Sequence, residues 1–370
     1  MTYLNHAATS YPKPPSVIEA MVRVLQAPPV SALRSTAGAT DDLPRQLRQA
    51  LAAVLQAKHP ESIVITSGAT DSINRLVVGL GIPDAIATAD NHNSVLRPLY
   101  NQPAIAHVEI VGDVSVIDAP ARWPSQWRGR RLVVVPHCSN VTGHIHDIPS
   151  ICAEAHKRGM TVMVDAAQSA GCIPIDADGW GADLIVFTGH KALFGPQGTG
   201  GFFFRPGTPL RPTLFGGTGR DSSIVDYAGK EWEHEVGTPN TPGMAGLKAG
   251  VDFVLSTSVE SIYRQVQEKT QRLIQQLDHL DKVTVYHAGS PRQGPVVSFN
   301  IEGLLPSDVG YLLENAYGIT VRTGLHCAPL MHQTLGTAPH GTVRASLSHL
   351  TTDADLDALV DALHEIVQGL

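Results

Sequence analysis

A carboxylate and an amine that can serve one cofactor follow two short apolar runs of the chain. Asp165 follows the run at 161–164, and Lys191 comes 26 positions later, just after the run at 184–187. A lysine amine can hold pyridoxal phosphate as a Schiff base, and a carboxylate beside the pyridinium nitrogen keeps the ring electron-withdrawing. Each residue alone would be an ordinary surface lysine or helix cap. The pair, each member at a strand end, predicts a pyridoxal phosphate site.

The segments around these residues alternate between strand and helix patterns. Apolar runs at 62–66, 132–136, 161–164 and 184–187 end in small or polar residues, and 71–80 has apolar residues at helical spacing. This alternation is typical of an α/β fold with a mostly parallel sheet and helices on both faces. Since ligands bind outside the carboxyl ends of parallel strands, we expect the four ends to meet at one site.

The C-terminal third of the chain predicts a second, smaller α+β domain. Helices are expected at 259–280, 307–316 and 352–368, with strands near 282–286 and 294–301. The expected division has three parts. Residues 1–15 contribute to the small domain and the active site, 16–250 form the large cofactor-binding domain, and 251–370 form the small domain with the Cys327 loop.

The composition disfavours several classes of protein. The 370 residues are 43% hydrophobic and 16% charged, which suits a large packed core and is untypical of disordered chains. The net charge is -7, and no basic run is longer than Arg130-Arg131, so nucleic acid and anionic membranes are poor partners. No signal peptide and no stretch of about 18 apolar residues occurs, which disfavours secretion and membrane insertion.

The cysteines favour a reducing compartment. The chain has four cysteines and no CxxC pair, a pattern that fits free thiols in the cytoplasm better than a disulfide framework or a zinc site. We therefore expect a cytoplasmic protein without a metal. The cysteines are Cys138, Cys152, Cys172 and Cys327.

Eight short motifs, in order and spacing, resemble those of class V aminotransferases of fold type I. Within that group they resemble the cysteine desulfurase and selenocysteine lyase family, and its second group in particular. The similarity covers nearly the whole chain. The motifs are Asn5-His6-Ala7-Ala8-Thr9, Ser67-Gly68-Ala69-Thr70, Asn91-His92, Ser139-Asn140-Val141-Thr142-Gly143, Asp165-Ala166-Ala167-Gln168, Thr188-Gly189-His190-Lys191, Gly237-Thr238-Pro239-Asn240-Thr241 and Val321-Arg322-Thr323-Gly324-Leu325-His326-Cys327-Ala328.

The resemblance implies a role for each residue of a pyridoxal phosphate site. Lys191 would hold the cofactor and shuttle protons, Asp165 would face the ring nitrogen, and His92 would stack on the ring and move protons. Gln168 would donate to the phenolate oxygen, with Asn140 beside that oxygen or the substrate amine. A turn at a helix start suits a dianionic phosphate. The phosphate-binding residues would be Ala69, Thr70, Thr188 and His190.

The same resemblance implies a homodimer with shared active sites. Glycine-rich loops at 215–219 and 237–241 would otherwise be plain turns. In the family such loops reach the neighbouring subunit's cofactor. Gly217 and Thr238 would then complete the phosphate site across a two-fold axis.

Cys327 is the expected nucleophile because it follows a polar, glycine-containing loop, whereas the other three cysteines lie in or beside apolar segments. In a desulfurase the thiolate attacks the sulfur of the bound cysteine, takes it as a persulfide and leaves alanine. Arg322, His326 and the cofactor would lower the pKa of Cys327. Arg344 would bind the substrate carboxylate through its planar fork, with Asn140 and Arg322 as further substrate contacts.

The expected reaction is therefore desulfuration of L-cysteine, with L-selenocysteine as a further substrate. The persulfide would pass to a scaffold protein, a sulfur carrier or a small thiol. Leu325 and His6 depart from the family pattern, and the loop after Cys327 is short. These departures lie on the substrate and acceptor side.

Two other hypotheses remain open. The same cofactor site would serve a C–S lyase, an aminotransferase or an epimerase in which Cys327 is incidental. A protein of another class would bind the cofactor as a regulatory or assembly subunit without turnover. The complete set of expected catalytic residues disfavours the second of these.

Overall fold

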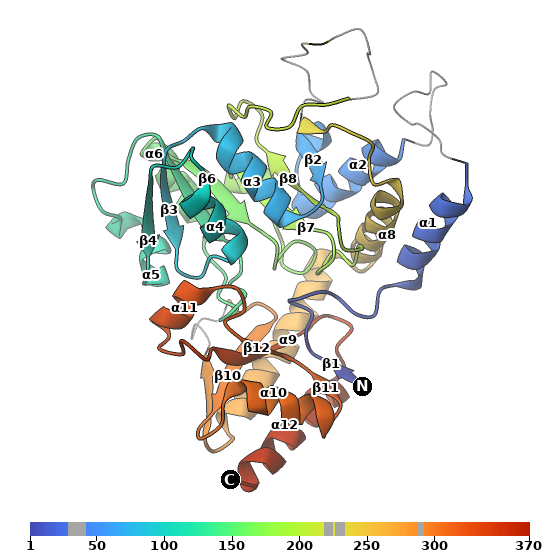
Figure 1. Cartoon of the computed structure of the whole chain (residues 1–370), viewed down its shortest axis with the longest axis vertical. Coiled ribbons are helices and arrows are strands. Elements are labelled where there is room, and N and C mark those ends of the chain that lie inside the picture. Colours follow the sequence, from blue (N-terminus) through green and yellow to red (C-terminus); the bar gives the residue numbers. More distant parts are fainter. Residues whose placement is uncertain (29–41, 218–224, 226–233, 287–291) are drawn as a thin grey trace.

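The structure is a computed structural model that describes residues 1–28, 42–217, 225, 234–286 and 292–370. It contains a seven-stranded sheet, a four-stranded sheet and a two-stranded sheet. The seven-stranded sheet belongs to the upper part of the molecule in Figure 1 and the other two to the lower part.

The large sheet has the order β2-β8-β7-β6-β5-β3-β4. The neighbouring strands from β7 to β4 pair in parallel, and β8 is antiparallel to both β2 and β7. The predicted α/β class with a mostly parallel sheet is confirmed. The strands are β2 (Ile63–Thr66), β3 (Asp84–Thr88), β4 (His107–Val111), β5 (Arg131–Pro136), β6 (Thr161–Asp165), β7 (Leu184–Thr188) and β8 (Gly200–Phe204).

Helices cover both faces of this sheet because its strands are apolar on both sides. Alternate residues of a strand point to opposite faces. In β5, Leu132 and Val134 pack in the core with α3 and α4, while Val133 and Val135 pack in the core with α2, α6 and α8. The helices of this part are α1 (Pro15–Gln26), α2 (Leu43–Leu55), α3 (Ala69–Leu80), α4 (Asn93–Asn101), α5 (Val114–Ile117), α6 (Ile148–Lys157), α7 (Ala177–Trp180) and α8 (Thr241–Thr257), with single turns η1 (Pro60–Ser62) and η2 (Pro120–Arg122).

The lower part is built on an antiparallel sheet of order β12-β13-β10-β9. The N-terminal strand β1 (Thr2–Tyr3) pairs in parallel with β11 (Ile319–Thr320), so the start of the chain joins this part. The other strands are β9 (Val283–Tyr286), β10 (Val296–Ile301), β12 (Arg322–Gly324) and β13 (Thr342–Ser346). The helices are α9 (Val259–Asp278), α10 (Pro306–Asn315), α11 (Pro329–Thr334) and α12 (Asp353–Gln368).

Helix α9 connects the two cores. Val259, Ile262 and Val266 pack in the core of the large sheet, and Leu273 and Leu277 pack in the core of the small one. We propose that the division into 1–15, 16–250 and 251–370 describes the domains, with α9 as the element that both share.

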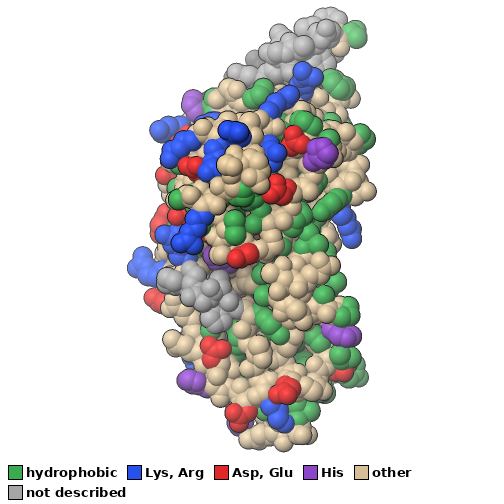
Figure 2. All heavy atoms as spheres, turned by 90° about the vertical axis from the view of Figure 1, so that its left-hand side faces the viewer, with side chains coloured by type: hydrophobic (Ala, Val, Ile, Leu, Met, Phe, Trp, Pro, Cys, Tyr) green, Lys and Arg blue, Asp and Glu red, His purple; other side chains and the backbone are tan. Residues whose placement is uncertain are grey.

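The surface in Figure 2 carries acidic and basic side chains that lie close together. Ion pairs join Arg158, directly after α6, to Glu154 of α6 and Arg131 of β5 to Glu109 of β4. In the described part of the chain, no helix has the length and apolar character needed to cross a membrane.

Candidate active site

Residues from the four expected strand ends line one cavity of about 400 Å³. The turn after β2 contributes Gly68, the loop after β5 contributes Asn140, and Asp165 and Lys191 lie at the ends of β6 and β7. Arg322 and Arg344 reach the same cavity from β12 and β13. The expected convergence is confirmed, and the volume suits a small molecule.

Lys191 and Asp165 have altered acid–base properties in this cavity. Burial lowers the pKa of Lys191 to about 8, although the charge of Asp165 opposes the shift. Burial raises the pKa of Asp165, against the effects of the Ala167 N–H, which donates to Oδ1 at 2.9 Å, and of Lys191. A lysine with a pKa near 8 has a sizeable neutral fraction at neutral pH, so its amine can attack a carbonyl.

The N-terminal segment holds the backbone around Lys191. Ser10 donates through Oγ to the Lys191 carbonyl at 2.8 Å, and Lys13 donates through Nζ to the His190 carbonyl at 2.9 Å. Gln168 donates through Nε2 to the Ala7 carbonyl at 3.1 Å while lining the cavity. The segment that pairs with the small domain therefore also positions the lysine.

The turn between β2 and α3 has the features of a phosphate site. Gly68 has a φ of 149°, a conformation that favours glycine, and α3 begins at Ala69 without a side-chain cap on its first N–H groups. Thr70, Thr188 and His190 line the cavity around this turn. Nδ1 of His190 is buried and has no hydrogen-bond partner among the described residues. An oxyanion here would accept hydrogen bonds from the first N–H groups of α3 and from the His190 ring.

A carboxylate near this turn is neutralised by a partner. Asp71 lies in the first turn of α3 and binds Arg75 through both oxygens, at 2.7 and 2.9 Å. Its negative charge is therefore compensated beside the place where a phosphate would bind.

His92 is held in the neutral form at the start of α4. Its Nδ1 accepts the Ser94 N–H at 3.0 Å. Burial and the charge of Lys191 lower the pKa of His92 to about 3, so the ring is an unprotonated imidazole at neutral pH. Because Nδ1 is used at the helix cap, Nε2 is the ring nitrogen left to act in the cavity.

Arg344 is a fully buried arginine with unused donors. Its Nη1 donates to the Asn140 carbonyl at 2.9 Å, whereas Nε and Nη2 are buried without a partner in the described structure. Buried donors are almost always paired, and a guanidinium fork matches a carboxylate. The site therefore fits a ligand that brings a carboxylate.

Cys327 lies beside the cavity in a fixed loop. Its Sγ accepts a hydrogen bond from Nη2 of Arg322 at 3.3 Å. Its carbonyl accepts the Asn93 N–H at 2.7 Å, and Nδ2 of Asn140 donates to the His326 carbonyl at 2.7 Å. His326 and Cys327 both have positive φ, 48° and 60°, which is unusual outside glycine.

The other three cysteines are buried, as expected. Burial raises the pKa of Cys152 and of Cys172 to about 12, and it also raises the pKa of Cys138. Cys138 lines the cavity nevertheless, which the sequence did not indicate. Buried thiols with raised pKa values are poor nucleophiles.

The expected effect of His326 on Cys327 is wrong. His326 is buried, its Nε2 contacts Thr342 Oγ1 at 3.0 Å, and burial together with the charge of Arg344 lowers its pKa far below the usual range. A neutral imidazole supplies no positive charge to a thiolate. Arg322 is the cation that contacts the sulfur.

Gly217 and Thr238 lie outside the lining of this cavity. The Gly237 N–H donates to the Gly217 carbonyl at 2.8 Å, so the two loops pair with each other. They lie by a second cavity of about 540 Å³, whose lining includes Gly237 and Ser67 of the turn before α3. Thr218 and Gly219 are outside the described residues. A role toward a partner subunit stays a prediction.

Several lining residues were not identified from the sequence. Asp90, Ser94, Gln197 and Gly198 line the cavity. Asp90 could have been found from its place two residues before His92 at the end of β3.

Comparison with known proteins identifies the family to which this chain belongs. The sequence matches the Aminotransferase class-V family over residues 2–359. The chain belongs to the class-V aminotransferase family. A "Probable cysteine desulfurase" of Halalkalibacterium halodurans is 37% identical over 241 residues, which are 64% of this chain and 58% of that protein. The matched part is thus about three fifths of the length of that curated relative.

Solved structures resemble this class-V protein over its full length. The apo cysteine desulfurase of Thermococcus onnurineus NA1 is 31% identical, with a TM-score of 0.86, and the match covers 100% of this chain and 95% of that one. A complex of the cystine C–S lyase C-DES with cysteine persulfide is 24% identical, with a TM-score of 0.81, over 98% of this chain and 97% of that one. The second similarity shows a shared fold, so the fold is common to proteins described as desulfurases and as lyases.

Proposed function

We propose that this class-V protein is a pyridoxal phosphate-dependent cysteine desulfurase that forms a persulfide on Cys327. The observation that carries the proposal is the contact between the Cys327 sulfur and Arg322 at 3.3 Å, because Arg322 itself lines the cavity of Lys191, Asp165 and Arg344. A thiol beside that cavity is placed to accept sulfur from a ligand bound there.

The residues of the cavity fit pyridoxal phosphate. Lys191 would hold the aldehyde carbon, Asp165 the ring nitrogen, and the turn at Gly68 the phosphate, with His190 and its unpaired Nδ1 beside that turn. His92 and Gln168 would contact the ring. When bound, the cofactor supplies an electron-withdrawing ring that stabilises negative charge on the substrate α-carbon.

The protein's own groups then bind the substrate and move its protons. The two unpaired donors of Arg344 would hold the α-carboxylate, which fixes the position of the side-chain sulfur. Lys191, with a pKa of about 8, can take and return a proton at the α-carbon. The neutral imidazole of His92 can exchange a proton through Nε2.

The sulfur step is balanced without an external oxidant. The Cys327 thiolate attacks the substrate sulfur, an S–S bond forms, and the bond between that sulfur and the β-carbon breaks. The β-carbon keeps the electron pair and receives a proton, so the products are alanine and a Cys327 persulfide. Arg322 stabilises the attacking thiolate through its charge.

We also propose the partners and setting of this reaction. L-Cysteine is the main substrate and L-selenocysteine a second one, and an acceptor protein or small thiol removes the persulfide sulfur. Gly217 and Thr238 would serve the partner subunit's phosphate site in a homodimer. The free thiols of the described residues support a reducing compartment such as the cytoplasm.

Product analysis tests the proposal. The purified protein, loaded with pyridoxal phosphate, is incubated with L-cysteine and dithiothreitol, and alanine, sulfide and pyruvate are measured. Equal amounts of alanine and sulfide are expected. Pyruvate and ammonia in place of alanine would identify a C–S lyase. The absence of all these products would contradict an activity on cysteine.

A further inference from the structure

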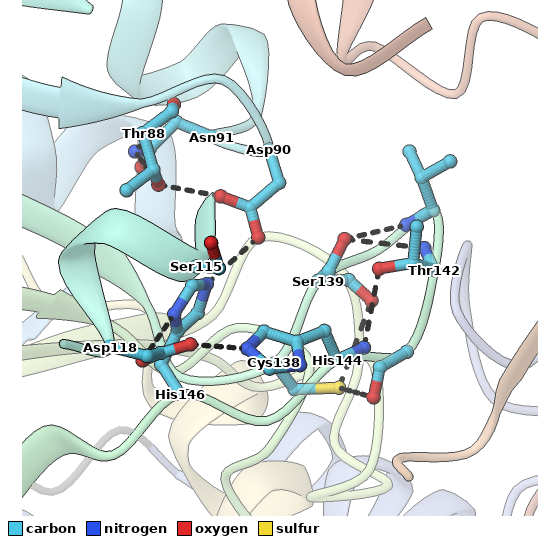
Figure 3. A network of polar contacts seen from close by, with 12 residues as sticks. Thr88, Asp90, Asn91, Ser115, Asp118, Cys138, Ser139, Thr142, His144 and His146 are labelled. Atoms are coloured by element: carbon cyan, nitrogen blue, oxygen red, sulfur yellow. Dashed lines mark hydrogen bonds and ion pairs between the residues drawn. The ribbon is translucent and has the colours of Figure 1, made fainter. Parts of the chain in front are cut away.

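A row of histidine and aspartate side chains lies beside the cavity and is separate from the proposed catalytic residues (Figure 3). Nε2 of His146 contacts Oδ2 of Asp90 at 2.9 Å, and its Nδ1 contacts Oδ1 of Asp118 at 3.0 Å. The other Asp118 oxygen contacts Nε2 of His144. His146 and Asp90 are buried, whereas the side chains of His144 and Asp118 are 16% and 18% exposed. The row therefore runs from the cavity wall toward the surface.

His146 connects two loops of the active site. Asp90 lies between β3 and α4, two residues before His92, and lines the cavity. His146 ends the loop after β5 that carries Asn140. These residues are 56 positions apart in the chain, and the ring of His146 joins the loops through hydrogen bonds.

The same two loops hold the peptide of the nucleophile. Asn93, directly after His92, donates its N–H to the Cys327 carbonyl at 2.7 Å. Asn140 donates Nδ2 to the His326 carbonyl at 2.7 Å. Both acceptors belong to residues with positive φ, which persist when surrounding contacts hold them. Three loops thus form a closed set of contacts around Cys327.

We propose that His146, as an imidazolium between Asp90 and Asp118, is a positioning residue that holds the loops of Asn93 and Asn140 and so fixes Cys327 for sulfur transfer. This proposal rests on the proposed function for its catalytic consequence. Its structural part, the fixed position of the Cys327 peptide, can be measured independently of activity.

The contacts of His146 favour a proton over a metal ion. The donor atoms of Asp118, His144 and His146 lie within 4.8 Å of one another, a spacing that a cation would accept. Both ring nitrogens of His146 already face carboxylate oxygens, however, so two N–H groups satisfy both carboxylates. The two carboxylates raise the pKa of His146 to about 9, against its burial.

The other titratable groups around His146 leave this charge in place. The imidazole of His144 packs edge-on against that of His146, with ring centroids 4.6 Å apart. His137 is buried, and burial together with the charge of His146 lowers its pKa to about 3, so it is neutral. His146 is therefore the group that balances Asp90 and Asp118 in the buried part of the row. Without it, two carboxylates from separate elements would face each other.

The test compares His146→Gln with the matched control His156→Gln. His156 forms the same kind of contact with a buried carboxylate, Asp183, at 2.9 Å, but it lies on α6, and this contact joins neither loop. Amide hydrogen exchange of the full-length holoenzyme reports the Asn93 N–H directly. We expect its exchange to be about tenfold faster in His146→Gln, equivalent to losing roughly one net hydrogen bond, and unchanged in His156→Gln. Unchanged exchange in His146→Gln would overturn the proposal.

Two activity readouts separate positioning from general damage. Persulfide formation on Cys327 in a single turnover should fall about tenfold in His146→Gln. Exchange of the α-proton of L-alanine with solvent needs no Cys327 and should change less than about threefold, because Ser10 and Lys13 hold the backbone of Lys191 and His190 without using these loops. An equal fall in both rates would overturn the positioning role. If the wild type forms no persulfide, the proposed function fails, and the Asn93 exchange still decides this inference.

Metal content provides the remaining outcome. The purified wild type and His144→Gln are each dialysed against Zn²⁺ and then against buffer, and their zinc content is measured. We expect the wild type to retain no more zinc than the variant. One zinc per wild-type chain that is absent from His144→Gln would show that a metal ion occupies this position, and it would overturn the proposal that His146 is an imidazolium.

Discussion

At the residue scale, Arg344 is the side chain whose chemistry is most constrained. Its Nε and Nη2 are buried without partners among the described residues, and a lysine cannot reproduce their fork. In Arg344→Lys we expect KM for L-cysteine to rise roughly 10- to 100-fold, since a charge-assisted hydrogen bond is worth about 1.5–3 kcal/mol. Steady-state kinetics measures this, and the absorbance of the bound cofactor should be unchanged.

A matched control separates this effect from loss of packing. Arg205→Lys alters an arginine that contacts the buried Asp183 far from the cavity. Its KM should match that of the wild type. An unchanged KM in Arg344→Lys would show that another group binds the carboxylate.

The protonation of His146 makes a second prediction at this scale. The folded protein keeps the His146 proton up to about pH 9, whereas an unfolded chain releases it near 6.5. The stabilisation is therefore complete below pH 6.5 and is lost as the pH rises through 9. Lys13 and Lys191, whose pKa values are lowered to about 8, act in the opposite direction over part of this range.

Comparison with His146→Gln isolates the contribution of His146, because the variant keeps both lysines. Urea unfolding at several pH values should give a difference in free energy of unfolding between wild type and variant that is largest near pH 6 and smallest near pH 10. A difference that is constant with pH would contradict a buried imidazolium.

At the scale of elements, the N-terminal segment links the small sheet to the end of β7. Ser10 is buried, and its single O–H lies within hydrogen-bond distance of two carbonyls, that of Lys191 at 2.8 Å and that of His190 at 3.1 Å. In Ser10→Ala these acceptors lose a partner, and we expect the free energy of unfolding to fall by about 1–3 kcal/mol. Chemical denaturation measures the change.

Ser307 provides the control for this change. Its hydroxyl contacts the neighbouring Asp308 on the surface, and Ser307→Ala should alter stability by less than about 0.5 kcal/mol. Equal effects in the two variants would mean that the contacts of Ser10 add nothing to stability.

Strand and helix positions were predictable because period and turn chemistry are local. The runs at 62–66, 132–136, 161–164 and 184–187 became strands of the large sheet, and their ends meet at the cavity. The link from Asp90 to His146 was not predictable, because it joins residues 56 positions apart and depends on how two loops pack. The neutral state of His326 follows from burial, which a single sequence does not show.

At the scale of the whole molecule, the loops of Gly217 and Thr238 predict a dimer. They do not line the cavity of Lys191, and the second cavity beside them includes Ser67 of the turn before α3. We expect light scattering to give twice the chain mass of 39.4 kDa. Thr238→Ala should weaken cofactor binding without changing this mass, and a fully loaded monomer would contradict the shared site.

The destination of the sulfur most directly tests whether Cys327 is the nucleophile. The holoenzyme is given one equivalent of L-cysteine without reductant, alkylated, digested and examined by mass spectrometry, beside Cys327→Ala. We expect one additional sulfur atom on the peptide that contains Cys327, with alanine formed in equal amount, and neither product in the variant. Pyruvate from both proteins, with no sulfur added to Cys327, would contradict this role of Cys327.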